Sequence, residues 1–84
     1  MSRSLPTRTV PSLAALRNGE TAELARLNVD PEAALRLMEL GLIPGCRILM
    51  ERRAPGGACV CRVDGCLLAL RRETAERLEV APVV

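Results

Sequence analysis

The sequence predicts one small, mostly β domain: a barrel of short strands with one α-helix inserted after the first strand and a short helical turn before the last. Short apolar segments separated by Gly and Pro turns indicate several strands rather than a doubly wound fold. Asp64-Gly65 is the two-residue signal of a β-hairpin. A helical pattern begins at Asp30 and ends at Gly41. Eighty-four residues accommodate one domain of this kind.

The chain before the helix is expected to contribute an arm, a turn and a first strand. The predicted parts of the whole chain are a flexible N-terminal arm (1–11), the domain (12–80) and a C-terminal tail (81–84). Ser12 is a candidate N-cap for a single helical turn over residues 13–16. A strand over residues 20–27 follows. Leu27 breaks its alternation, which indicates either a bulge near Arg26 or an earlier end of the strand.

The helix and the corner after it are marked by residues with specific backbone preferences. Asp30 is suited to the N-cap and Pro31 to the first helical position. Gly41 ends the helix in a left-handed conformation, and the Leu/Met stripe of the helix is expected to face the core. Pro44-Gly45 then turns the chain into a second strand over residues 46–53.

The second half of the chain predicts a hairpin, a helical turn and a last strand. The hairpin strands span residues 58–63 and 66–71, and a two-residue loop fixes their register. The expected opposing pairs are Val63 with Cys66, Cys61 with Leu68, and Cys59 with Leu70. A short turn over residues 73–77 leads to a last strand marked by Leu78 and Val80.

Composition excludes several classes of function. Twelve basic residues, all Arg, against ten acidic ones give a net charge of +2, which is an ordinary surface and not a basic stripe. No aromatic residue is present to stack on bases, so a nucleic-acid partner is not expected. Without histidine, no Ser/His/Asp or Cys/His set can form, and no enzyme is expected. The loop Ala54–Gly57 lacks the Lys-Ser/Thr of a phosphate-binding loop.

The distribution of apolar residues predicts a cytoplasmic protein. No run of about 18 apolar residues exists, so no direct membrane insertion is expected. The N-terminal arm is polar and lacks the apolar stretch of a signal peptide. The four cysteines are then expected to be reduced thiols rather than disulfides.

The cysteines form the one constellation with the chemistry of a metal site. Cys59, Cys61 and Cys66 lie on one face of the predicted hairpin, and thiolates so placed could take zinc, Cu(I) or, less readily, ferrous iron. Neither a Cys-x2-Cys motif nor a histidine completes such a site. Because these cysteines share the parity of Ile48 and Val63, packing as small core hydrophobes is the favoured interpretation, and metal ligation is the alternative.

Four segments of the chain carry a resemblance to a known family through their order and spacing. They are Leu13–Glu20, Arg36–Gly45, Arg53–Gly57 and Leu68–Val80. With these segments the chain resembles the ferrous iron transport protein A (FeoA) family over most of its length. The resemblance implies an SH3-like β-barrel and a cytoplasmic accessory protein of bacterial ferrous iron uptake. The implied partner is the cytosolic GTPase domain of the membrane transporter, the B component of the system.

The resemblance also bears on sites. It brings no catalytic residues and requires no cofactor, with a divalent transition metal, Fe or Zn, as the ligand that the cysteine alternative would take. Branched aliphatic residues are common in the family where Cys59 and Cys61 stand, which favours the core interpretation of these two thiols. Cys66 stands where a larger polar or aromatic residue is common.

The apolar residues around the corner predict a surface for a protein partner. The segment carries more large apolar side chains than one side of a corner can bury. The expected partner-binding residues are Leu40, Leu42 and Ile43 at the corner, and Pro55 and Gly56 in the loop after the second strand.

Overall fold

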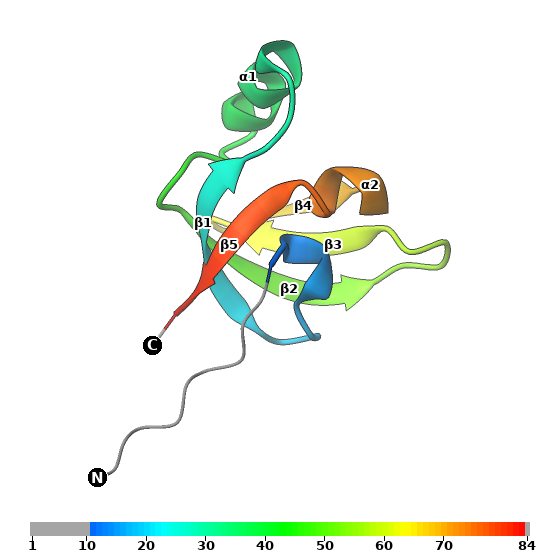
Figure 1. Cartoon of the computed structure of the whole chain (residues 1–84). Coiled ribbons are helices and arrows are strands. Elements are labelled where there is room, and N and C mark those ends of the chain that lie inside the picture. Colours follow the sequence, from blue (N-terminus) through cyan, green and yellow to red (C-terminus); the bar gives the residue numbers. More distant parts are fainter. Residues whose placement is uncertain (1–10, 84) are drawn as a thin grey trace, which may run out of the picture.

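A computed structural model describes residues 11–83, so nearly all of the predicted N-terminal arm lies outside the described residues. Five strands form one antiparallel sheet in the order β4-β3-β2-β1-β5 (Figure 1). The elements are, in chain order, the 3-10 turn η1 (Leu13–Ala15), β1 (Thr21–Leu27), α1 (Pro31–Glu39), β2 (Arg47–Arg53), β3 (Cys59–Val63), β4 (Cys66–Leu70), α2 (Arg72–Ala75) and β5 (Leu78–Pro82). The prediction of a mostly β domain is confirmed.

The sheet of the described residues is not closed. β4 pairs only with β3, and β5 pairs only with β1, so both are edge strands and the predicted barrel is not confirmed. β5 also runs further than expected, because Ala81 pairs with Glu23 and Pro82 with Ala22 inside what was predicted as a tail. Proline is tolerated there because an edge strand does not need every N–H for pairing.

The bulge predicted in the first strand is confirmed. Leu24 pairs with Val80 and Arg26 with Glu79, which leaves Ala25 without an opposing residue. The extra residue restores the inward direction of the chain after Leu24, so that Leu27 is half-buried against the core. The strand therefore does not end early.

The helix begins and ends where its capping residues predict. The Oδ1 atom of Asp30 accepts a hydrogen bond from the Ala33 N–H at 2.8 Å. At the other end Gly41 has a φ of +103°, and its N–H donates to the Met38 carbonyl at 3.0 Å. The Leu42 N–H donates to the Leu37 carbonyl, also at 3.0 Å. This pair of hydrogen bonds is the Schellman motif, which satisfies the last carbonyls of the helix.

The corner is closed by a turn and tied to the sheet. The Cys46 N–H donates to the Ile43 carbonyl at 3.0 Å across Pro44-Gly45, with Gly45 at a φ of +97°. Proline at the second turn position and a positive φ at the third are the features of a type II turn. The Gly45 N–H also donates to the Leu24 carbonyl at 2.7 Å, which fixes the corner against β1.

The hairpin of β3 and β4 has the predicted turn and register. Asp64 and Gly65 have φ values of +55° and +82°, as both central positions of a type I′ turn require. The three predicted opposing pairs are all present. The main core is built from buried residues of all five strands, both helices and η1: Leu13, Leu16, Ala22, Leu24, Leu37, Leu42, Ile48, Met50, Cys59, Cys61, Val63, Leu70, Ala75, Leu78 and Val80.

Candidate functional site

Exposed apolar side chains gather on α1 and the corner that follows it. Among the described residues, five large apolar side chains are exposed, and four of them lie within residues 35–43. These four are Leu35 (58% exposed), Met38 (39%), Leu40 (54%) and Ile43 (48%), and together they are called the corner surface. The fifth, Leu67, lies on β4.

The placement of α1 explains why its apolar residues remain exposed. The helix projects from the sheet rather than lying across it (Figure 1), and Leu37 is the one side chain of α1 that is buried. The predicted core stripe is therefore narrower than expected. Leu37 packs on the core, whereas its neighbour Met38 is 39% exposed, because α1 stands away from the sheet and only one side of its last turn meets the core.

Three corner residues were expected to contact a partner, and for Leu42 the structure contradicts this expectation. It is fully buried within the core, whereas Leu40 and Ile43 are about half exposed. The Schellman motif is the physical reason, since it folds the residue after Gly41 back toward Leu37 and buries the two leucines. Leu40 and Ile43 stay available, and Leu42 does not.

The loop with Pro55 and Gly56 does not join this surface. Both residues are exposed, and they lie in the loop between β2 and β3. The corner and this loop occupy opposite ends of β2, at the left and the right in Figure 1. The strand rises about 3.3 Å per residue and separates the corner from the loop. The two segments therefore belong to different surfaces, and a partner would need a separate contact for each.

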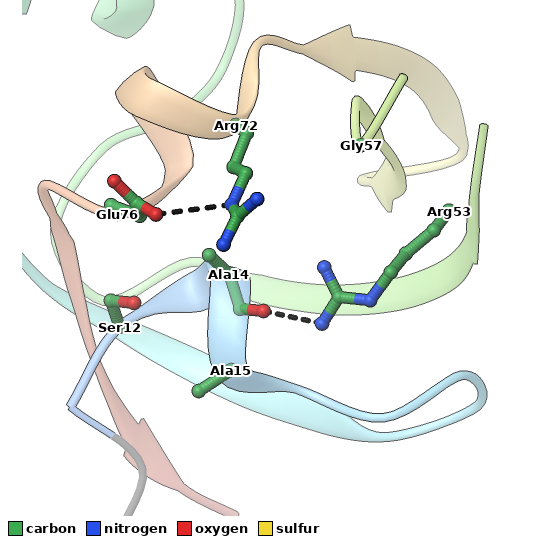
Figure 2. A pocket seen from close by; sticks show the side chains of 7 residues that line it. All are labelled: Ser12, Ala14, Ala15, Arg53, Gly57, Arg72 and Glu76. Carbon is green, nitrogen blue, oxygen red and sulfur yellow. Dashed lines mark hydrogen bonds and ion pairs between the residues drawn. The ribbon is translucent and has the colours of Figure 1, made fainter. Parts of the chain in front are cut away.

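A pocket lies beside this loop, between η1, the end of β2 and α2. Its volume is about 440 Å³, and its charged residues are Arg53, Arg72 and Glu76 (Figure 2). This pocket has no counterpart among the site residues expected from the sequence. Its two arginines come from segments that are far apart in the chain. The one signal in the sequence that could have indicated this pocket is the Gly56-Gly57 loop near Arg53.

The thiols are placed only partly as predicted. Cys59 and Cys61 are fully buried, which agrees with the core interpretation, and Cys46 is half-buried. Cys66 is exposed, which corrects the expectation that all the thiols face the interior. Cys66 is the first residue of the edge strand β4, directly after the hairpin turn, so it has a neighbouring strand on one side only. Within residues 11–83, no three His, Cys, Asp or Glu side chains lie close enough together to hold a metal ion.

Burial makes two of the thiols weaker acids than an exposed cysteine. It raises the pKa of Cys61 from 9.0 to about 12, with a further contribution from the neighbouring Cys59 and an opposing one from Arg53. Burial also raises the pKa of Cys46 above its usual range. Since the thiolate is the reactive and metal-binding form, the fold suppresses the chemistry of these two cysteines.

Comparisons with known proteins agree on one family. The family model described as "FeoA domain" matches residues 12–82. A search of curated proteins gives no match. No helix in the described part of the chain has the length and apolar character needed to cross a membrane.

Solved structures of related proteins resemble the chain in sequence and fold. FeoA from Chlorobium tepidum is 34% identical with a TM-score of 0.82, over 87% of this chain and 70% of that one. Iron(II) transport protein A from Clostridium thermocellum is 33% identical with a TM-score of 0.80, over 86% of this chain and 45% of that one. Zinc-complexed FeoA from Stenotrophomonas maltophilia is 28% identical with a TM-score of 0.67, over 84% of this chain and 89% of that one. The last is described as a prokaryotic SH3 domain protein and a candidate ferrous iron transport activating factor.

Proposed function

Because this chain belongs to the FeoA domain family, we propose that it is a small cytoplasmic accessory protein of bacterial ferrous iron uptake. It binds the cytosolic GTPase portion of the membrane iron transporter and modulates it. The family links the chain to ferrous iron transport, and the description of the Stenotrophomonas maltophilia relative as a candidate activating factor supports an accessory role.

The corner surface is the observation that carries the proposed binding. Large exposed apolar side chains are ordinary when scattered, but a small domain that gathers four of five in nine residues has a candidate contact surface. α1 projects from the sheet, so a partner can approach this surface without displacing another element (Figure 1). A contact of this kind needs no catalytic group.

Different elements hold the two halves of the corner surface in place. Leu35 and Met38 are three residues apart on α1 and therefore share one face of the helix. Leu40 lies within the segment closed by the two Schellman hydrogen bonds, and the Ile43 carbonyl accepts the Cys46 N–H in the turn that follows. The partner thus meets a surface that is already ordered, which lowers the entropy lost on binding.

Titration of the full chain against the isolated GTPase domain of the transporter tests this function, once with GDP and once with a GTP analogue. We expect saturable binding in at least one nucleotide state. No binding in either state, together with no binding to the full-length transporter, would overturn the proposal.

A matched pair of variants tests the surface itself. Leu40 and Leu67 are 54% and 55% exposed, so replacing either by Glu places a charge on an equally exposed apolar site. Leu40→Glu is expected to weaken binding by about tenfold or more, because a buried contact would have to accept a charge. Leu67→Glu is expected to leave binding unchanged. Equal losses in both variants, with folds intact by circular dichroism, would exclude the corner surface as the contact.

A further inference from the structure

The pocket beside the β2–β3 loop holds more positive charge than the chain neutralises. It lies between η1, the last residue of β2 and α2, and Figure 2 shows its two arginines facing it from opposite sides. Arg53 and Arg72 supply two positive charges, and Glu76 supplies one negative charge. No other acidic residue lines the pocket.

Arg53 is fixed in place without a carboxylate partner. Its Nη2 donates to the backbone carbonyls of Ala14 and Leu16, the second at 2.9 Å, and its Nη1 contacts the Cys59 sulfur at 3.7 Å. None of these partners carries a full negative charge. No carboxylate therefore neutralises the positive charge of this guanidinium among residues 11–83. Its Nε–H and one Nη1–H have no partner among the same residues.

Arg72 has donors to spare on the same pocket. Its Nε donates to the Glu76 Oε2 at 3.2 Å, and no hydrogen bond of its two terminal nitrogens to residues 11–83 is present. One of these nitrogens points toward Ala14 (Figure 2). Gly57 lies next to this side chain, since a Cβ placed on Gly57 would lie 3.4 Å from the Arg72 Cδ. The Arg72–Glu76 ion pair is exposed and therefore weak, so an incoming anion can compete with it.

A buried hydroxyl completes the polar lining. Ser12 is only 9% exposed, and it is the one buried polar residue of the described chain. It precedes η1 without capping it, and no hydrogen bond of its hydroxyl to residues 11–83 is present. A buried polar group without a partner is unfavourable, and a ligand that accepts its hydrogen bond would relieve that cost.

We propose that this pocket binds a carboxylate side chain of an acidic peptide segment, held by the guanidinium groups of Arg53 and Arg72 and by the hydroxyl of Ser12. Guanidinium groups bind carboxylates through paired hydrogen bonds. One carboxylate neutralises the single excess charge, whereas a phosphate monoester, at about −1.5 to −2, would leave the pocket with a net negative charge. The volume of about 440 Å³ also leaves room for flanking peptide atoms against Ala14 and Ala15.

This proposal does not depend on the transporter or on the corner surface. The test is an NMR titration of the full chain that follows the Arg Nε–Hε signals of Arg53 and Arg72 and the amide of Gly57. The probes are a terminally blocked six-residue peptide with two adjacent glutamates, its glutamine counterpart, and inorganic phosphate. We expect saturable shifts with the glutamate peptide and none with the glutamine peptide.

Variants separate pocket binding from general charge attraction. Arg72→Gln is expected to weaken binding of the glutamate peptide by about tenfold, and Arg71→Gln, with the same loss of charge next to the pocket, is expected to leave it unchanged. Glu76→Gln is expected to strengthen binding, because it frees Arg72 and removes a repelling carboxylate. If Arg72→Gln does not fold, Ser12→Ala tests the pocket instead. It leaves the charge unchanged and is expected to weaken binding of the glutamate peptide.

Four results would overturn the proposal. They are no shift up to about 10 mM peptide, equal shifts with both peptides, shifts with phosphate but not with the glutamate peptide, and equal losses in Arg71→Gln and Arg72→Gln.

Discussion

The Leu42 N–H donates to the Leu37 carbonyl at 3.0 Å, and both leucine side chains are buried. This hydrogen bond turns the chain at the end of α1 and separates two neighbouring apolar residues into different roles. Leu42 belongs to the core, and Leu40 belongs to the exposed corner surface. The stability of the domain and the composition of its exposed corner surface therefore depend on the same turn.

Gly41→Ala is expected to destabilise the domain by about 1–2 kcal/mol, because a residue with a Cβ is strained at positive φ. No atom lies within 4 Å of a Cβ placed there, so the cost comes from the backbone and not from a clash. Urea unfolding measures it. Gly41→Asn is the control and is expected to cost less, since asparagine tolerates the left-handed region better. Equal costs for Ala and Asn would contradict this assignment.

Leu42→Ala and Leu40→Ala are expected to differ strongly in stability. Removing a fully buried leucine side chain costs about 2–5 kcal/mol through lost burial and the cavity that remains. Removing the half-exposed Leu40 is expected to change stability by about 0.5 kcal/mol or less. The midpoints of urea unfolding at constant slope give both values. Similar losses for the two variants would mean that Leu40 also packs against the core.

Local chemistry predicts much of this fold. The register of β3 and β4 follows from a two-residue turn at Asp64-Gly65, since so short a loop allows one alignment. The ends of α1 follow from Asp30 and Gly41 in the same way. The bulge near Arg26 follows from a break in alternation. In each case the sequence signal lies within a few residues, even where, as at the bulge, the paired strand is distant in the chain.

What sequence reasoning missed depends on contacts between distant segments. The alternation along β4 gives Cys66 the same parity as inward-facing residues. Only the sheet order shows that β4 is an edge strand, in which this residue is exposed. Helical periodicity could not separate Leu40 from Leu42, because the Schellman motif resets the direction of the chain. Arg53 and Arg72 approach one pocket only after β2 and α2 have packed around η1.

Asp30→Ala is expected to cost about 1 kcal/mol, because it removes the acceptor for the Ala33 N–H at the start of α1. Asp30→Asn keeps an acceptor and is expected to cost less. Since α1 projects from the sheet, hydrogen exchange of its amides is a direct measurement. Faster exchange confined to α1 is the expected result for Asp30→Ala, and unchanged exchange would show that the cap contributes little.

The four thiols are expected to react with a small thiol reagent at different rates. Cys66 is exposed and should react first in the native state, while Cys59 and Cys61 are fully buried and should react only on opening of the core. Cys66→Ser removes the fast phase and leaves the slow ones. A fast phase that persists in Cys66→Ser would come from the half-buried Cys46 or from a buried thiol, and its loss in Cys46→Ser would distinguish the two. In urea all four should react quickly.

Alkaline pH is expected to destabilise the domain through Cys61. The chain has no lysine, tyrosine or histidine, so cysteine is its one side-chain type whose unperturbed pKa lies between about 5 and 12. Burial raises the pKa of Cys61 from 9.0 to about 12. The folded state then holds a proton that the unfolded state releases, so stability is full below pH 9 and falls as the pH rises toward 12.

The slope from this one thiol approaches about 1.4 kcal/mol per pH unit once the unfolded thiol is ionised. The half-buried Cys46 adds to it in the same direction, since its pKa is also raised. Urea unfolding at pH 8, 9, 10 and 11 measures the slope. Cys61→Ala is expected to lower stability at pH 8 but to flatten the decline above pH 9, because it removes the titrating group. An equally steep decline in Cys61→Ala would show that another group causes the loss.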